Sequence, residues 1–133
     1  MKINILGHGV MGSQVAALMQ ILGHEVFVWT RSASDEKSRR QSQAVRLLKR
    51  VISPGNSEGS CNFIAQVSDL SPALTIECLP ESLEIKHLIL GQLAFAADTV
   101  EFFTNTSSIA PASLANGALG LHFFNPIHVV RLV

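Results

Sequence analysis

Short apolar runs alternate with longer segments of helical character along the chain. Four runs, each bounded by polar or turn-forming residues, are typical of strands buried in a parallel sheet. They are residues 2–6, 25–29, 61–67 and 74–79. Two further strands are predicted at residues 99–104 and 119–124.

Helical segments are predicted between these strands. Helix formers occupy residues 13–22 before Gly23, and a polar helix is predicted from about 35 to 52, where Ser53-Pro54-Gly55-Asn56 forces a stop and opens a surface turn. Two later helices are expected: an amphipathic one, whose apolar positions follow a mainly helical period, and a short one with proline in its first turn. They are residues 83–95 and 111–116.

This alternation of strands and helices predicts one α/β domain over residues 1–133. We expect a Rossmann-type, doubly wound and mainly parallel sheet with helices on both faces. The first strand, helix and second strand form a βαβ unit, which should cross over with right-handed connectivity.

Charge and composition exclude several classes of protein. Ten basic and ten acidic residues give a net charge of zero, so there is no overall positive field to attract nucleic acid or anionic lipid. No apolar stretch approaches the roughly 20 residues that span a bilayer. Cys61 and Cys78 lack metal-site spacing, and nothing upstream resembles a secretory signal. We expect a cytoplasmic, reduced chain with no metal, nucleic-acid or membrane partner.

The segment Gly7-His8-Gly9-Val10-Met11-Gly12 follows a strand and opens a helix, which is the context that a dinucleotide-binding glycine motif requires. Gly7 permits the tight turn, Gly9 lets a pyrophosphate approach the backbone, and Gly12 lets helix and strand pack closely. His8 is expected to be a permissive turn residue that faces solvent or cofactor. The alternative is a glycine-rich turn without a ligand. The predicted cofactor-binding residues of this turn are Gly7, Gly9, Val10, Met11 and Gly12.

The end of the second strand bears on which dinucleotide binds. NAD-specific sites of this design place an acidic residue there for the ribose hydroxyls, but here Thr30 is followed by Arg31 and Ser32. A guanidinium with neighbouring hydroxyls suits a 2′-phosphate, so the cofactor is predicted to be NAD or NADP, with Thr30 and Arg31 in contact. The alternative is that Arg31 is an ordinary solvated charge. Six basic residues within 37–50 are expected to be a solvated helix face, although they could meet ligand phosphates.

The last third of the chain carries more specific motifs. They are Glu77-Cys78-Leu79-Pro80-Glu81 followed by Lys86, then Asn105-Thr106-Ser107-Ser108, and then His122-Phe123-Phe124-Asn125-Pro126. In order and nearly in spacing, they resemble the 3-hydroxyacyl-CoA dehydrogenase family. The resemblance covers essentially the whole chain and implies hydride transfer between NAD(P) and a 3-hydroxyacyl-CoA.

The resemblance also assigns roles to individual residues. It implies that His122 is the base that takes the hydroxyl proton, a task that suits a group with a pKa near neutrality. It implies that Ser107 hydrogen-bonds the reacting oxygen and that Asn125 holds the substrate and the nicotinamide side of the site. Further residues are implied to bind the cofactor, and they are Glu81, Lys86 and Asn105. The alternatives are a core histidine, turn chemistry for the serine and asparagines, and a solvated helix start for Glu81 and Lys86.

The chain also departs from the family pattern. The family's catalytic histidine is oriented by a glutamate about a dozen residues further on, which here would come directly after Val133. The family's helical C-terminal domain, which shapes the acyl-CoA cleft and forms the dimer, also lies beyond that residue. We therefore expect an isolated chain that binds NAD(P) with negligible turnover, and a homodimer for the full-length protein.

Two other functions stay open at this point. The stretch between the second and third strands is shorter than usual in the family and omits a helical insertion that often contacts CoA. That difference favours a dehydrogenase of a free hydroxy acid. The other alternative is a non-catalytic module that reports the redox state of the NAD(P) pool.

Overall fold

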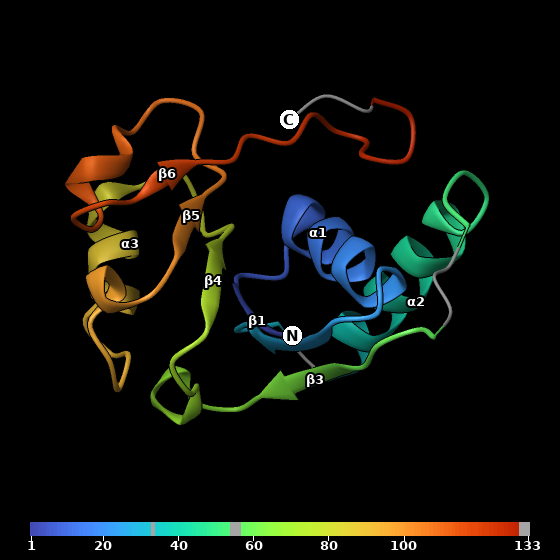
Figure 1. The fold of residues 1–133 in the computed structure, drawn as a ribbon, viewed down its shortest axis with the longest axis horizontal. Coiled ribbons are helices and arrows are strands. Elements are labelled where there is room, and N and C mark those ends of the chain that lie inside the picture. Colours follow the sequence, from blue (N-terminus) through green and yellow to red (C-terminus); the bar gives the residue numbers. More distant parts are fainter. Residues whose placement is uncertain (33, 54–56, 131–133) are drawn as a thin grey trace.

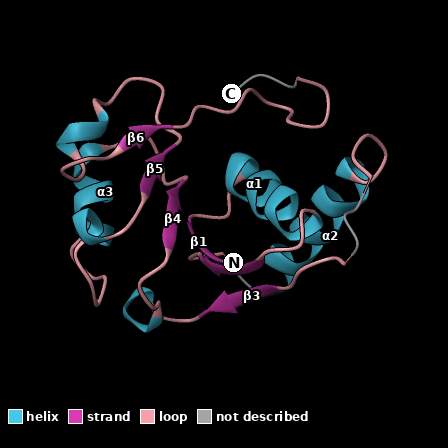
Figure 2. Ribbon diagram, viewed as in Figure 1, coloured by secondary structure: helices cyan, strands magenta, loops and turns pink. Residues whose placement is uncertain are grey.

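Six parallel strands form a single sheet in the order β3-β2-β1-β4-β5-β6 (Figures 1 and 2). The computed structural model describes residues 1–32, 34–53 and 57–130. The strands are β1 (Lys2–Leu6), β2 (Glu25–Trp29), β3 (Cys61–Ile64), β4 (Leu74–Glu77), β5 (Phe102–Thr104) and β6 (Leu119–Gly120). Strand order reverses between β1 and β4, and open α/β sheets bind their ligands at such a switch point.

Helices cover both faces of the sheet, so the predicted Rossmann-type doubly wound fold is confirmed (Figure 2). On one face lie α1 (Val10–Ile21) and α2 (Ser34–Leu48), and on the other lies α3 (Leu83–Leu90). Short 3-10 turns complete the described elements. They are η1 (Val67–Asp69), η2 (Ala97–Thr99) and η3 (Pro111–Ser113).

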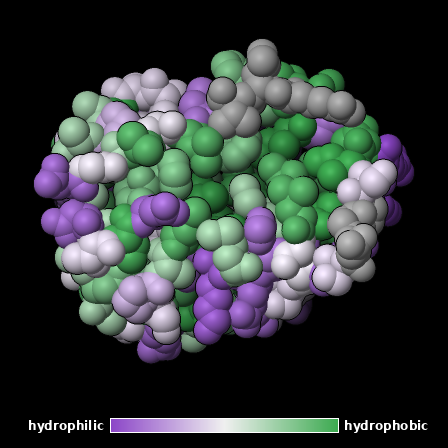
Figure 3. All heavy atoms as spheres, in the orientation of Figure 1, coloured by the Kyte–Doolittle hydropathy of each residue, from purple (hydrophilic) through white to green (hydrophobic). Residues whose placement is uncertain are grey.

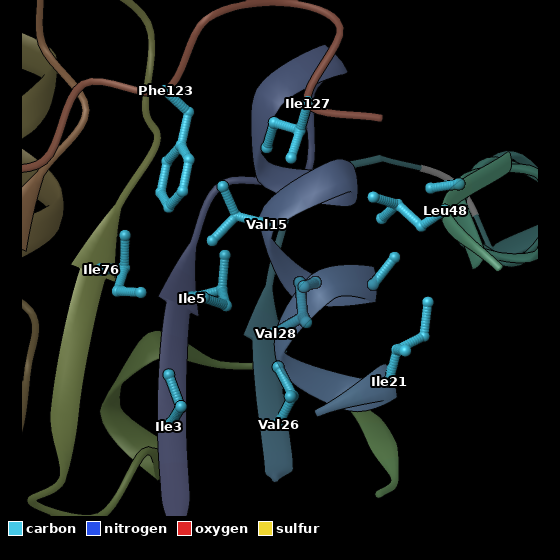
Figure 4. Packing of buried hydrophobic residues seen from close by; sticks show 13 residues of the cluster. Ile3, Ile5, Val15, Ile21, Val26, Val28, Leu48, Ile76, Phe123 and Ile127 are labelled. Atoms are coloured by element: carbon cyan, nitrogen blue, oxygen red, sulfur yellow. The ribbon is translucent and has the colours of Figure 1, made fainter. Parts of the chain in front are cut away.

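The larger core lies between the sheet and α1 and α2 (Figure 4). Strands β1, β2 and β4 contribute Ile5, Val28 and Ile76, and α1 packs Val15 against them. The segment after β6 also enters this core through Phe123, which is buried. Because burial of apolar surface stabilises a fold, this contact fixes the segment around Phe123 against the core.

The opposite face has a smaller core under α3. Trp29, Leu79 and Ile89 are buried there together with three other apolar residues, Leu6, Val67 and Leu70. The polar side chain of Asn4 is also buried on the sheet and donates to the carbonyl oxygen of Ser71 at 2.9 Å. This hydrogen bond satisfies a group that would otherwise be costly to bury.

Several predicted elements are shorter in the structure. The third and fourth strands end at Ile64 and Glu77 rather than at residues 67 and 79, and the polar helix ends at Leu48 rather than near 52. The helix predicted at 111–116 is only the 3-10 turn η3. The helix stop and surface turn were predicted at residues 53–56, and residues 54–56 lie outside the described residues.

The two last strands differ most from prediction. Residues 97–99 form a 3-10 turn in which the Thr99 hydroxyl donates to the carbonyl of Ala96 at 2.7 Å, so β5 begins only at Phe102. The strand predicted at 119–124 ends at Gly120. Beyond it the chain leaves the sheet edge and crosses to α1, where the Ile127 amide donates to Gln14 at 2.8 Å.

In the part of the chain that the structure describes, no helix is long and apolar enough to cross a bilayer. Apolar residues nevertheless gather on the face shown in Figure 3, over α1.

Both cysteines are free thiols. Burial raises the pKa of Cys61 to about 11 and that of Cys78 to about 12, so both are protonated at neutral pH.

Candidate functional site

In the turn between β1 and α1, two of the three glycines lie where the backbone leaves no room for a side chain. Gly7 has a φ of +96°, and a Cβ there would lie 2.6 Å from the carbonyl oxygen of Cys78. A Cβ on Gly12 would lie 2.1 Å from the carbonyl oxygen of Gly7. A Cβ on Gly9 would meet no atom within 4 Å, so this position borders open space. The three glycines therefore have different physical roles, as the motif predicts.

A cavity of about 460 Å³ opens beside this turn, at the carboxyl ends of β1, β2 and β4. Its volume is within the range of small-molecule sites. Most of the residues predicted to bind a cofactor line it, namely Gly7, Gly9, Val10, Met11, Thr30, Arg31, Glu81 and Asn105. Gly12 lies outside this lining, beneath the turn.

The N-terminal end of α1 faces the cavity through Val10 and Met11. The first amide of the helix with a backbone acceptor is that of Ser13, which donates to Gly9 at 3.1 Å. The amides before it are the unpaired donors of a helix start, and the first turn contains no acidic residue. This end of α1 can therefore hold an anion such as a pyrophosphate.

The far end of the same cavity is formed by the residues after β2. The Thr30 hydroxyl lies 3.2 Å from the Ser32 hydroxyl and accepts a hydrogen bond from the Ser32 amide at 3.2 Å. The side chain of Arg31 is exposed beside them. Among the described lining residues, the only carboxylate is that of Glu81, which belongs to the segment between β4 and α3.

Glu81 organises the turn that contains Ser107. Its Oε1 accepts hydrogen bonds from the Thr106 hydroxyl, from the Ser107 amide at 3.1 Å, and from the Ser108 amide and hydroxyl at 2.9 and 2.8 Å. Partial burial alone would raise the pKa of Glu81. The hydrogen bonds from Thr106 and Ser108 and the charge of Lys86 outweigh that effect and lower the pKa to about 2.

Lys86 was predicted to lie beside the cofactor, but it does not line the cavity. Its ammonium lies 2.7 and 2.8 Å from the two carboxylate oxygens of Glu77 and 3.3 Å from the carbonyl oxygen of Leu79. The Thr104 hydroxyl donates to the same carboxylate at 2.6 Å. Both charged side chains are at most 1% exposed, so Lys86 neutralises a buried carboxylate and reaches the cavity side only through Glu81, 3.8 Å away.

His122 is exposed and is held by a residue of the cavity. Its Nδ1 lies 3.2 Å from the carbonyl oxygen of Asn105, and the Asn105 side chain accepts a hydrogen bond from the Phe123 amide at 2.8 Å. A carbonyl can only accept, so Nδ1 is the donor in this contact, and in the neutral imidazole Nε2 is then the nitrogen with a lone pair. The Phe124 ring packs edge-on at 5.4 Å between centroids.

Asn125 lies in the segment that crosses α1. Its side-chain oxygen accepts a hydrogen bond from Gln14 at 2.9 Å, and the Gln14 oxygen accepts from the Ile127 amide at 2.8 Å. Gln14 therefore positions the segment after His122, a role that nothing in the sequence indicated. Within the described residues, no hydrogen bond joins the side chains of Ser107, His122 and Asn125 to one another.

His8 differs from expectation. Of the two positions predicted for its ring, the solvent-facing one is wrong, because the side chain is 1% exposed. The Nε2 atom lies 2.9 Å from the Gln41 side-chain oxygen, and the ring packs edge-on against Phe63 at 5.0 Å between centroids. Burial, and to a smaller extent the charges of Arg40 and Lys37, lower the pKa of His8 against the raising effect of the Gln41 hydrogen bond.

Comparison with known proteins agrees with this geometry. The sequence model of the family described as 3-hydroxyacyl-CoA dehydrogenase, NAD binding domain, matches residues 2–133. The chain belongs to this family. It is 29% identical to the mitochondrial hydroxyacyl-coenzyme A dehydrogenase of Homo sapiens, over 98% of this chain and 48% of that protein. It is 30% identical to the 3-hydroxyadipyl-CoA dehydrogenase of Escherichia coli, over 98% of this chain and 31% of that protein.

Solved structures give the same fold. The 3-hydroxybutyryl-CoA dehydrogenase of Escherichia coli superposes with a TM-score of 0.71 at 28% identity, over 95% of this chain and 30% of that one. A diketoreductase superposes with a TM-score of 0.72 at 25% identity, over 97% of this chain and 52% of that one. The chain thus spans between 30% and 52% of the length of these relatives.

Proposed function

We propose that this chain is the dinucleotide-binding domain of an NAD(P)-dependent 3-hydroxyacyl-CoA dehydrogenase. The cavity beside the glycine turn is the observation that carries the proposal. It joins an anion-binding helix end at Gly9–Met11, a ribose end at Thr30–Ser32, and a third end at Asn105, whose carbonyl oxygen holds His122. A dinucleotide that lies across the cavity would reach from the turn to the neighbourhood of that imidazole.

His122 is the proposed base. With Nδ1–H directed at the Asn105 carbonyl oxygen, the free Nε2 atom can take the hydroxyl proton of a secondary alcohol. The bound dinucleotide would supply the hydride acceptor. Ser107 and Asn125 are proposed to fix the reacting oxygen, and Glu81 and Gln14 support them by holding the two segments that carry these residues.

Lys86 is proposed to have a supporting role without contacting the cofactor. Because its ammonium is bound to Glu77, it supports the segment after β4 and the Glu81 carboxylate rather than touching the cofactor. Asn105 and Glu81 remain the proposed contacts on the nicotinamide side, since both line the cavity.

The cofactor is proposed to be NAD or NADP, with Arg31 placed to contact the 2′-phosphate of NADP. Two hydroxyls and an exposed guanidinium, from Thr30, Ser32 and Arg31, form the ribose end of the cavity, and no described residue there would repel a 2′-phosphate. If so, replacement of Arg31 by Ala weakens NADPH binding about tenfold while NADH binding changes little. Equal affinity of the wild-type chain and Arg31→Ala for NADPH would exclude the 2′-phosphate contact.

Calorimetric titration of the 133-residue chain with NADPH and NADH tests the proposal as a whole. We expect saturable binding of at least one dinucleotide and negligible turnover of acetoacetyl-CoA by this chain alone. Absence of saturable binding with both would contradict the assignment. His122→Gln should bind dinucleotide as the wild-type chain does, because the proposed base acts on the substrate.

A free hydroxy acid is the second candidate substrate. The described residues between α2 and β3 contain no further helix to contact CoA, and the similar diketoreductase is described as acting on dicarbonyl compounds. Saturation-transfer NMR with acetoacetyl-CoA and with acetoacetate, in the presence of the dinucleotide, would distinguish the two substrates.

A cytoplasmic setting is also proposed. Two free, unpaired cysteines suit a reducing cytoplasm. Assembly of the full-length protein as a homodimer rests on the family resemblance.

A further inference from the structure

The peptide bond between His8 and Gly9 lies at the centre of the glycine turn and is held from one side by α2. Arg40 donates through Nη1 to the carbonyl oxygen of His8 at 2.5 Å, and Glu36 pairs with Arg40 from one helical turn before it. The imidazole of His8 reaches the same helix at Gln41. Consecutive residues of α2 therefore hold both the backbone and the side chain of this turn residue.

The orientation of that carbonyl fixes the orientation of the next amide. The peptide is trans, because the only cis bond of the described chain precedes Pro126, and in a planar trans peptide the C=O and N–H groups point in opposite directions. With the His8 carbonyl turned toward Arg40, the Gly9 N–H points away from α2. Gly9 lines the cavity, and within the described residues its N–H has no hydrogen-bond partner.

The side-chain contact of His8 belongs to a longer relay of hydrogen bonds. Gln41 donates to the Gln20 oxygen at 3.0 Å, and Gln20 donates to Glu58 at 3.2 Å. A carboxylate can only accept, so the relay has one direction: both amides are oriented by Glu58, and Gln41 presents its oxygen to His8. His8 is thereby fixed with the proton on Nε2, and its imidazole is anchored in one orientation.

We infer that His8 is a positioning residue for dinucleotide binding: together with Gln41 and Arg40 it holds the His8–Gly9 peptide so that the Gly9 N–H is presented to the cofactor phosphates. This inference rests on the proposed function, since it concerns the same cavity. It gives a role to the buried side chain at position 8, where the glycine motif does not specify a residue type. A donor that is already oriented binds an anion without the cost of ordering the loop.

Four variants test the inference by calorimetry with NADPH and NADH, each with a parallel melting curve. His8→Leu removes the donor to Gln41, and His8→Gln restores an N–H donor near the same place. We expect His8→Leu to weaken binding of the preferred dinucleotide about five- to tenfold, as for the loss of one hydrogen bond, and His8→Gln to recover affinity to within about twofold of the wild type.

The second pair compares neighbouring arginines of α2. Arg40→Leu removes the contact with the His8 carbonyl and should weaken binding to a similar degree, whereas Arg39→Leu removes an equal charge from an exposed position. Arg40→Leu also keeps the test informative if His8→Leu fails to fold. If His8 and Arg40 matter only for stability, their variants will have lower melting temperatures and will bind dinucleotide as tightly as the wild type.

The outcomes separate this inference from the function on which it rests. Lack of binding by the wild-type chain overturns both. Normal binding by the wild type together with unchanged affinity in His8→Leu and Arg40→Leu overturns the positioning role alone. Equal weakening by His8→Leu and His8→Gln overturns it as well, because the donor would then be irrelevant. If Arg39→Leu loses as much affinity as Arg40→Leu, the effect comes from the loss of a positive charge alone. That result would overturn the role proposed for the hydrogen bond from Arg40 to the His8 carbonyl.

Discussion

The ammonium of Lys86 in α3 lies 2.7 and 2.8 Å from the two carboxylate oxygens of Glu77 in β4, and both side chains are buried. Removal of one partner leaves the other charge buried without compensation. Lys86→Met should therefore lower the free energy of unfolding by about 3–5 kcal/mol in urea titrations. The exposed pair of Lys49 and Glu58 provides the control, because Lys49→Met should cost less than about 1 kcal/mol. Similar costs for the two variants would contradict a charge-pairing role for Lys86.

The glycine turn predicts opposite results for two alanine substitutions. Gly12→Ala would place a methyl group 2.1 Å from the Gly7 carbonyl oxygen, so we expect a loss of about 1–3 kcal/mol in stability. Gly9→Ala meets open space and should change stability by about 1 kcal/mol at most. The same methyl group projects where phosphates would approach, so dinucleotide affinity should fall. Melting curves and calorimetry together measure both effects, and an unchanged affinity in Gly9→Ala would place the phosphates elsewhere.

Glu81 should contribute to stability only above acid pH. Its pKa of about 2 in the folded chain lies below the ordinary value of 4.5, so its contribution is complete above pH 4.5 and is lost as the pH falls toward 2. The side chain is 38% exposed, and solvent screening reduces the effect to about 1 kcal/mol. Unfolding titrations of the wild type and Glu81→Gln at pH 6 and pH 3 should therefore converge at the lower pH. A constant difference between the two proteins would exclude this linkage.

His8 should make the fold sensitive to pH in the range below neutrality. Its pKa is lowered by burial, with smaller contributions from the α2 charges Arg40 and Lys37, whereas the β3 side chain in contact, Phe63, is neutral. An unfolded chain therefore binds a proton near pH 6.5 that the folded chain binds only at lower pH. Stability is complete above pH 6.5 and falls as the pH drops.

The matched comparison is the wild type against His8→Gln between pH 7.5 and pH 5.5, measured as the free energy of unfolding. The wild type should lose more stability over this range, since the four other histidines are common to both proteins. Parallel pH profiles would show that the His8 imidazole takes up its proton equally in the folded and unfolded chains.

Local sequence patterns were sufficient for the order of the elements and for most of the residues that line the cavity. Apolar runs such as 25–29 mark buried strands because a parallel sheet covered on both faces demands them, and the glycine spacing marks a turn whose sterics allow no other residue at Gly7 and Gly12. The motif around Asn105 and His122 likewise indicated residues that the structure joins by a hydrogen bond.

Contacts between distant segments could not be predicted in this way. The burial of His8 depends on α2 and β3, which begin more than twenty residues later, and the pairing of Lys86 depends on a glutamate in the neighbouring strand. The course of residues 121–127 over α1 depends on Gln14. Strand and helix periods report which face of an element is apolar, and they carry no information on which remote polar group will meet a given side chain.

The sequence by itself therefore determined a doubly wound sheet and a glycine turn at Gly7–Gly12, and it predicted the chemically active side chains, because these follow from local sterics and short motifs. Only the tertiary structure decided that Lys86 is buried against Glu77, that Glu81 caps the Ser107 turn, and that His8 is tied to α2. Those outcomes depend on the desolvation and pairing of groups brought together by packing, and that is a property of the assembled layers.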